Sequence, residues 1–456
     1  MLVKRLVVLG CMALFISVGR AYGSEETATQ EALRRLEARV EVLEKKVAEQ
    51  DKCLKEQKSC IVEQDKKIAE YESRLTQFDT DLHRQVGAPI TIAEGLTIGA
   101  GATMVVQGSD KTNSTAGEAA EGRTDASYSA DITIGKEFRD VGGKAFLHLE
   151  VGTGNGLEDN LTLYSNVNRD ADNDNNVRLT ELWYEQVFLR GKVAATFGKL
   201  DPTAYFDNND GANDETTQFL ARIFRNSATI EFPDNTAGVR MAYAPLMWLE
   251  FGYGIFDADS DWEKIGDNLF NISQVTFKTK LFDLPGNYRF LAWHSNLSHT
   301  KWLDTAQTKE EAFGAALSFD QKVDDVTTVF VRYGWQDPRV YNPDLMATGD
   351  FNYSLKQSWS AGLQVEGKPW GRDNDVLGFA VGQVFPSDDY KKAGSLSVPA
   401  PAAKTEGHLE AYYRIQVNDH LSISPDLQYI WNPFGKDAGD DIGAIFVGGT
   451  RVQVDF

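Results

Sequence analysis

The chain has 456 residues, of which 42% are hydrophobic, and it carries a formal net charge of −21 with a mean hydropathy of −0.36. Such an acidic chain would repel the phosphates of nucleic acid, which excludes nucleic acid as a partner. The sequence also contains no glycine-rich phosphate loop, no G-x-S-x-G turn and no H-E-x-x-H zinc motif, so neither an enzyme with a catalytic site nor a cofactor is expected.

Residues 1–23 are typical of a secretory signal peptide. Lys4 and Arg5 precede an apolar run over 6–18, and small residues flank a cleavage position after Gly23. The run is short for a membrane span, which disfavours an uncleaved anchor. Lipidation at Cys11 is also disfavoured, because the apolar run continues past it.

Residues 24–86 are predicted to form a periplasmic α-helical coiled coil. Apolar residues recur at two seam positions of a seven-residue repeat, and one position reads Leu33, Val40, Val47, Leu54, Ile61, Ile68, Leu75 and Leu82. A single amphipathic helix cannot bury this stripe, so the segment is expected to self-associate. A homotrimer is preferred, and a dimer is the alternative.

Three glutamines, Gln50, Gln57 and Gln64, occupy the other seam position. Buried polar seam residues cost stability but fix register and strand number, so we expect the glutamines to set the oligomer register. The alternative is that they are tolerated weak points. Cys53 and Cys60 lie beside the seam about 10 Å apart along the helix, too far for an intrachain disulfide. Interchain disulfides and free thiols remain equally open.

Residues 87–456 show period-two alternation, which predicts an all-β domain. A soluble sandwich and a membrane barrel both fit this pattern, and strand number and loop lengths favour the barrel. An even number of antiparallel strands closes a barrel without free edges. We predict 16 strands that start near Leu96, Ser127, Lys144, Val177, Lys192, Thr236, Leu246, Leu269, Asn287, Ala312, Val326, Ser358, Val376, His408, Leu421 and Ala444.

Connections between these strands alternate between short and long, as in multi-pass proteins of the bacterial outer membrane. The predicted fold is therefore an all-β transmembrane barrel of 16 antiparallel strands, preceded by a long coiled coil in the periplasm. The third long connection, 201–235, is long enough to have a function of its own. Asn213 or Asp214 is predicted to cap a short helix there, and the apolar residues that follow favour a loop folded into the barrel over a surface loop.

Four strings, "GKLDPTAYFDNNDGANDETTQFL", "EFPDNTAGVRMAY", "RDNDVLGFAVGQVFPSDDY" and "DHLSISPDLQYIWNP", resemble the carbohydrate-selective porin (OprB) family. The resemblance covers about residues 190–456. It implies a 16-stranded barrel, often trimeric, through which sugars diffuse passively. The coiled coil is a departure from the simplest family members, and the charge of −21 leaves the sugar preference open.

A sugar pore needs aromatic faces for the apolar ring surface and charged groups that replace hydroxyl hydration. Alternation and the start of the third long connection give the following predicted pore residues: Glu181, Trp183, Glu185, Lys199, Asp201, Tyr205, Phe206, Asp207, Arg240, Arg289, Trp293, Arg332, Glu410 and Arg414. The alternative for each arginine is a structural ion pair in the wall. The alternative for both tryptophans is a position in the aromatic girdle at the membrane interface.

The string "DADNDNNVRLTE" has the spacing of a calcium loop, with candidate ligands Asp170, Asp172, Asp174, Asn176 and Glu181. The flanking helices of such a loop are absent, so a solvated acidic loop is favoured over Ca²⁺ binding.

The favoured function is passive diffusion of mono- or oligosaccharides across the outer membrane. One alternative is a general or cation-leaning porin. The other is a structural tether that contacts the cell wall through the coiled coil.

Overall fold

The computed structural model describes residues 33–50, 52, 54–55, 58, 90–113, 121–171, 175–343, 355–393, 403–436 and 443–456. The chain divides into two units, Met1–Ser73 and Arg74–Phe456, which are considered separately. The predicted signal peptide lies outside the described residues.

In the first unit, residues 33–50 form a continuous α-helix. Its apolar seam residues Leu33, Leu36, Val40, Leu43 and Val47 are 46–62% exposed within this single chain. Gln50 lies in this helix, whereas Gln57, Gln64, Cys53 and Cys60 lie outside the described residues. No helix in the described part of the chain is both long and apolar enough to cross a membrane.

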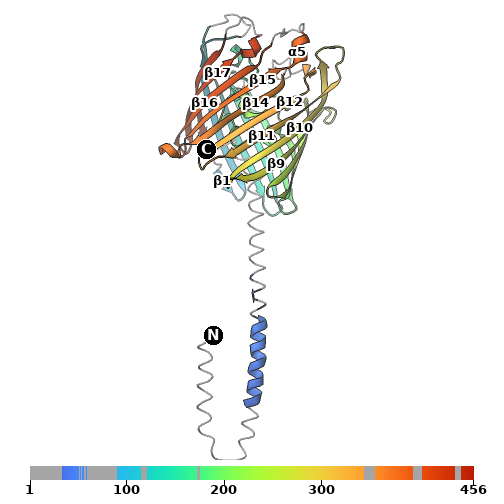
Figure 1. The fold of residues 1–456 in the computed structure, drawn as a ribbon, viewed down its shortest axis with the longest axis vertical. Helices are drawn as coiled ribbons and strands as arrows, with labels where there is room; N and C mark the ends of the chain where they lie inside the picture. The colour runs from blue at the N-terminus through green and yellow to red at the C-terminus, as the bar shows by residue number, and fades with distance from the viewer. Residues whose placement is uncertain are drawn as a thin grey trace, which may run out of the picture. The chain divides into compact units, whose positions relative to one another are not determined.

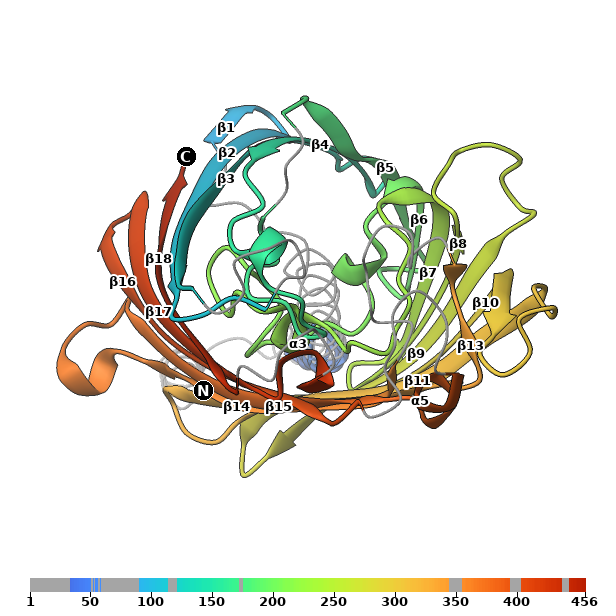
Figure 2. The ribbon, with the colours of Figure 1, turned by 90° about the horizontal axis from the view of Figure 1, so that it is seen from above.

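The second unit is a closed ring of 16 antiparallel strands (Figures 1 and 2), which confirms the predicted strand number. The ring closes where β18 pairs with β2, for example at Thr450 and Val106. The ring strands are β2 (Leu96–Ser109), β3 (Arg123–Phe138), β4 (Gly143–Thr153), β5 (Arg178–Phe188), β6 (Val193–Leu200), β7 (Thr236–Leu246), β8 (Leu249–Asp257), β9 (Leu269–Leu281), β10 (Leu284–Lys301), β11 (Glu310–Lys322), β12 (Thr327–Gln336), β14 (Leu355–Glu366), β15 (Val376–Pro386), β16 (Glu406–Asn418), β17 (Leu421–Trp431) and β18 (Ile445–Asp455).

Short elements complete the unit. The strand β1 (Ile90–Ala93) pairs with β2, and β13 (Val340–Tyr341) pairs with β10. Among the described residues, the helical elements in the connections are η1 (Glu158–Asn160), η2 (Pro202–Ala204), α3 (Arg222–Arg225), η4 (Lys368–Trp370), α5 (Asp388–Ala393) and η5 (Pro433–Lys436).

Each ring strand has an apolar face and a polar face. The apolar face points out of the barrel, whereas in a soluble sandwich it points into the core. On β7, Val239, Met241 and Tyr243 are exposed, while Arg240 between them is buried. The same alternation runs through the ring, with apolar side chains outside and many buried polar side chains inside. This arrangement suits a wall with lipid on its outer face.

Connections at one end of the barrel are tight. The turn between β9 and β10 consists of Phe282 and Asp283, both with φ near +60° (53° and 65°), as a two-residue hairpin turn between twisted strands requires. The opposite end carries the long connections between ring strands, 154–177, 201–235, 337–354 and 387–405.

Placing a charge on the outer face tests this assignment. We predict that Val331→Arg on β12 lowers the free energy of unfolding in lipid vesicles by about 2–4 kcal/mol, because the side chain would enter hydrocarbon. Val323→Arg is the matched control, since Val323 is similarly exposed (51% against 47%) but lies in the turn between β11 and β12. Equal urea midpoints for the two variants would contradict a lipid-facing position for Val331.

Candidate functional site

Segment 201–235 is attached to the barrel wall by the buried side chain of Arg332. This guanidinium donates hydrogen bonds to the backbone oxygens of Phe224 (2.6 Å) and Asp207 (2.9 Å), and its Nε lies 3.4 Å from the Asp207 carboxylate. Asp207 also accepts a hydrogen bond from the backbone N–H of Ser227 at 2.6 Å. Burial raises the pKa of Asp207, and the Arg332 guanidinium opposes that rise. One arginine thereby joins two distant parts of the segment.

Two further side chains hold the backbone of the same segment. The Glu410 carboxylate on β16 accepts hydrogen bonds from the backbone N–H groups of Leu220 (2.6 Å) and Ala221 (3.0 Å). Arg451 on β18 donates to the backbone oxygens of Glu215 (2.7 Å) and Gln218 (2.8 Å). These contacts satisfy backbone groups that regular secondary structure leaves free in this part of the chain.

Aromatic side chains of the segment pack against the strands. Phe219 lies 5.7 Å from Phe330 and 5.0 Å from Tyr412 between ring centroids, and Phe206 meets Phe256 edge to face at 6.2 Å. Apolar burial and backbone hydrogen bonds therefore act on the segment together.

The predicted helix after Asn213 or Asp214 is wrong. Asp214 instead accepts hydrogen bonds from the backbone N–H and the hydroxyl of Thr216, at 2.8 and 2.7 Å, which closes a turn. The α-helix of the segment is the short α3, which begins after Ala221, a residue without a capping side chain. The Asp214 carboxylate thus caps a single turn, closed by the hydrogen bond from Gln218 N–H to the Asp214 backbone oxygen at 2.8 Å, that does not continue as a helix.

The neighbouring connection between β4 and β5 is held in a similar way. Glu406 on β16 accepts hydrogen bonds from the backbone N–H groups of Tyr164 (3.1 Å) and Ser165 (2.8 Å). Glu158 accepts from Val167 and Asn168, each at 2.9 Å. Burial raises the pKa of Glu158 to about 7, and these two N–H groups limit the rise.

A cavity of about 840 Å³ lies between segment 201–235, the β4–β5 connection and the inner face of β3, β4 and β5. Its lining contains ten Asp or Glu residues and five Lys or Arg residues among those described. The wall contributes Asp131, His148, Glu150, Arg178 and Glu181. The segment contributes Asp201, Glu215, Arg222 and Arg225 among others. The cavity is therefore strongly polar with an acidic balance.

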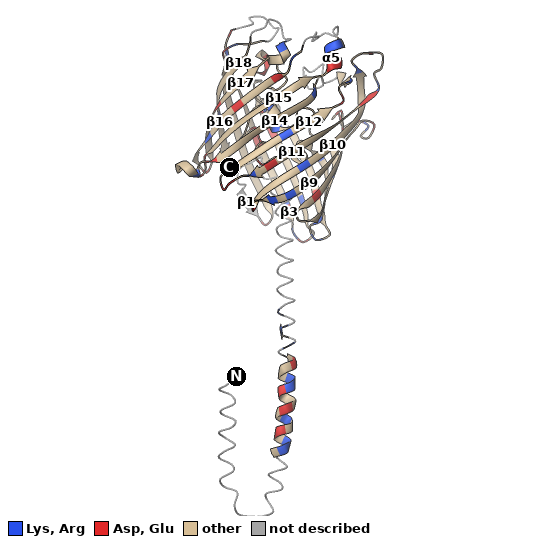
Figure 3. Ribbon diagram, in the orientation of Figure 1, with Lys and Arg blue, Asp and Glu red and all other residues tan. Residues whose placement is uncertain are grey.

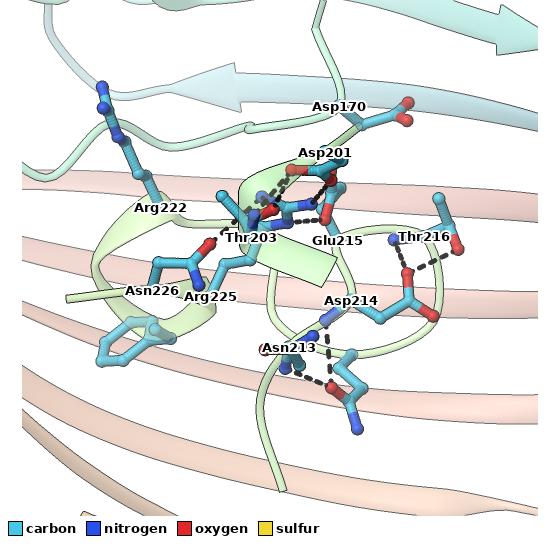
Figure 4. Close-up of polar contacts among 12 residues, drawn as sticks. Asp170, Asp201, Thr203, Asn213, Asp214, Glu215, Thr216, Arg222, Arg225 and Asn226 are labelled. Atoms are coloured by element: carbon cyan, nitrogen blue, oxygen red, sulfur yellow. Dashed lines mark hydrogen bonds and ion pairs between the residues drawn. The ribbon is translucent and has the colours of Figure 1, made fainter. Parts of the chain in front are cut away.

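Arg225 is held between two carboxylates on the segment side of this cavity (Figure 4). Its Nη2 lies 3.9 Å from Asp201, and its Nε forms an ion pair with Glu215. Its Nη1 donates to the Thr203 hydroxyl at 3.3 Å. Although burial alone would lower it, these carboxylates raise the pKa of Arg225 above its usual value, so the guanidinium stays charged.

On the wall side, His148 bridges two acids, with its ring nitrogens 2.8 Å from Asp131 and 3.6 Å from Glu181. Asp170, from the β4–β5 connection, accepts a hydrogen bond from the Ser129 hydroxyl at 2.9 Å. Burial raises the pKa of Asp170 well above its usual range.

Of the predicted pore residues, Glu181, Lys199 and Asp201 line this cavity. Three of the four predicted arginines lie outside the cavity lining, in ion pairs. Arg240 lies 3.4 Å from Glu185, Arg289 pairs with Asp320, and Arg332 pairs with Asp207. Arg240 and Arg289 therefore have partners in the wall, as the alternative interpretation described, whereas the partner of Arg332 lies in segment 201–235.

The predicted aromatic residues lie in a buried cluster and do not line the cavity. Trp183 stacks on Phe146 at 5.0 Å, and Trp293 stacks on Phe270 at 5.8 Å. Both tryptophans are 3% exposed, so neither is in an outer girdle. Tyr205 lies under the Arg240 guanidinium at 4.8 Å, and Phe206 packs on Phe256.

The last two predicted residues lie on β16. Glu410 binds the backbone of segment 201–235 as described, and Arg414 is half-buried. For the predicted calcium site, Asp172 and Asp174 lie outside the described residues. Asp170 and Glu181 line the same cavity, and Asn176 is exposed, so this site stays a prediction.

Sequence reasoning missed most of the cavity lining. Asp131, His148, Glu150 and Arg225 were not predicted, nor was the contact made by Arg451. Period-two alternation along β3 could have placed Asp131 on the inner face with Ser129. No local pattern marks Arg225, because its position depends on how the segment returns to the wall.

Comparison with known proteins agrees with this geometry. The model of the family described as "Carbohydrate-selective porin, OprB family" matches residues 120–456. Porin B of Pseudomonas aeruginosa is 30% identical over 324 residues, which make up 61% of this chain and 68% of that protein. The high-pH structure of Pseudomonas putida OprB has a TM-score of 0.68 at 17% identity, and the match covers 80% of this chain and 94% of that one.

The family match extends over more than half of the chain, and the 16-stranded ring with an apolar outer face is the fold that such a protein requires. The chain therefore belongs to the carbohydrate-selective porin (OprB) family and is a porin of the bacterial outer membrane.

Proposed function

We propose that the protein is a passive pore for mono- or oligosaccharides in which segment 201–235 folds inward and narrows the lumen. The observation that carries the proposal is the set of contacts from Arg332, Glu410 and Arg451, on three different strands, to the backbone of this one segment. The view from above draws α3 within the ring of strands (Figure 2). The polar cavity beside the segment is then the path for the solute.

The chemistry of the cavity suits polyhydroxylated solutes. Arg225 and the carboxylates of Asp201 and Glu215 offer donors and acceptors to neighbouring hydroxyl groups. Phe232 is the aromatic side chain in the lining and gives a face for the apolar side of a sugar ring. Binding to such a site must remain weak, because conduction requires release as well as entry.

Planar-bilayer recording tests the sugar path. We predict that mono- or disaccharides reduce the ionic current of the protein, and that Arg225→Gln raises the half-blocking sugar concentration about fivefold. This corresponds to about 1 kcal/mol for one lost charge-assisted contact in a wet site.

Arg139→Gln is the matched control, because Arg139 lies in the turn between β3 and β4 and pairs only with Glu137, at 3.1 Å, among the ion pairs of the described residues. This variant should leave the half-blocking concentration unchanged. A current insensitive to every sugar tested would contradict the proposed preference.

The acidic balance of the cavity favours one alternative, a general porin that prefers cations. Ten acidic residues against five basic ones should raise the local concentration of cations. The reversal potential in a KCl gradient distinguishes the two functions. Strong cation selectivity without a sugar block would replace the sugar pore by the cation-leaning porin.

We further propose that residues 24–86 associate as a coiled coil, with three chains preferred over two. The exposed seam of residues 33–50 and the alternating acidic and basic residues around it (Figure 3) support this proposal. The coiled coil would then hold several pores in one oligomer or contact the cell wall.

Replacing the three glutamines tests the role of the seam. We predict that Gln50→Leu, Gln57→Leu and Gln64→Leu together, in the full-length chain, raise the thermal midpoint of helix loss. Oligomer number should become heterogeneous, because apolar layers no longer specify a register. Circular dichroism and native mass spectrometry of the detergent-solubilised protein measure the two effects. A single, unchanged oligomer number would show that the glutamines do not specify it.

A further inference from the structure

Three carboxylates meet where β8 ends. Asp257 is the last residue of this strand, and Asp259 and Asp261 follow in the connection to β9. One carboxylate oxygen from each residue lies within 4.8 Å of the others. The cluster is separate from the calcium loop predicted at residues 170–181.

The described residues place no cationic side chain against this cluster, and its close donors are neutral: Asn268 Nδ2 donates to Asp259 at 2.6 Å, and the backbone N–H of Glu263 donates to Asp261 at 2.7 Å. None of its three carboxylates forms a salt bridge with a described residue. Asp257 is 1% exposed, and its Oδ1 has no hydrogen-bond donor among the described residues. The Oδ2 atom of Asp257 has only distant donors, the Thr236 hydroxyl at 3.5 Å and the Trp262 N–H at 3.4 Å.

Three other buried acids have close partners that are positively charged or donate short hydrogen bonds. Asp207 pairs with Arg332, Asp320 pairs with Arg289, and Glu410 receives two backbone N–H groups. A buried carboxylate without such partners costs several kcal/mol, and neighbouring carboxylates add repulsion. The orphaned Oδ1 of Asp257, beside two more acids, therefore indicates a cationic partner that is not a side chain.

Ligand chemistry narrows the identity of that cation. All available donors are oxygens, which suit hard divalent cations, and there is no sulfur or imidazole in the cluster. Alternate residues over 257–261 supply the carboxylates, as in the first half of a calcium loop. Calcium tolerates an irregular shell of carboxylate, carbonyl and water oxygens better than magnesium does.

We propose that Asp257, Asp259 and Asp261 bind Ca²⁺ and that the ion fixes the 258–268 connection to the end of β8. Asp259 and its neighbours Ala258 and Ser260 also line the polar cavity. The ion consequently lies at the border of the cavity and reduces its acidic balance. This site does not depend on which solute the pore conducts.

Terbium luminescence tests binding directly, because Trp262 follows Asp261 in the chain and can transfer excitation to a bound Tb³⁺. In the full-length protein in detergent, we predict tryptophan-sensitised luminescence that Ca²⁺ displaces and Mg²⁺ displaces poorly. Asp257→Asn combined with Asp259→Asn should weaken Tb³⁺ binding at least tenfold. Asp283→Asn, an exposed acid in the β9–β10 turn, is the matched control and should bind like the unchanged protein.

Protection of the 258–268 connection against proteolysis gives a second test of Ca²⁺ binding. Lys264 is exposed within 258–268, and Ca²⁺ should slow its cleavage by a lysine-specific protease that needs no calcium. The double variant should lose this calcium effect while keeping the β-sheet circular dichroism spectrum of the unchanged protein, which shows that it is folded. Luminescence or protection that is the same in the double variant, or absent from the unchanged protein, would overturn the proposal.

Discussion

The buried guanidinium of Arg332 is the contact on which the interior of this barrel depends. A charge removed from water must be compensated by partners with good geometry, and here the partners are the Asp207 carboxylate and two backbone oxygens. Those oxygens belong to residues 207 and 224, so a single side chain brings two separated parts of segment 201–235 to one point of β12. Glu410 and Arg451 then hold the backbone between these two parts.

With segment 201–235 held in this position, the inner wall has two regions. Beside β7 to β12, charges are paired in compact networks such as Arg240–Glu250–Lys278, and aromatic side chains pack around them. Beside β3 to β5, acidic groups surround the polar cavity. The arginines of the first region form ion pairs, and the groups of the second line the proposed path of the solute.

Strands could be predicted from the sequence because their signal is local. Period-two alternation depends on neighbouring residues alone, and each predicted start lies within four residues of the observed one. The inner position of Arg240, Arg289 and Arg332 followed from the same rule. Their partners did not, since Asp207 and Asp320 lie far from them in sequence or on another strand. Arg225 and Asp214 show the same limit, because contacts of the folded segment decide their roles.

Cross-linking segment 201–235 to the wall tests the central claim most directly. A Cβ built at Gly334 of β12 lies 3.4 Å from the Cβ of Ser227, close to the spacing of a disulfide. The chain would carry Ser227→Cys and Gly334→Cys, with Thr229→Ala to make room, in a background with Cys53→Ser and Cys60→Ser. If the segment rests on the wall, the disulfide forms and single-channel conductance is the same before and after reduction. A pair that does not cross-link, or a conductance that falls on oxidation and recovers on reduction, would contradict the account.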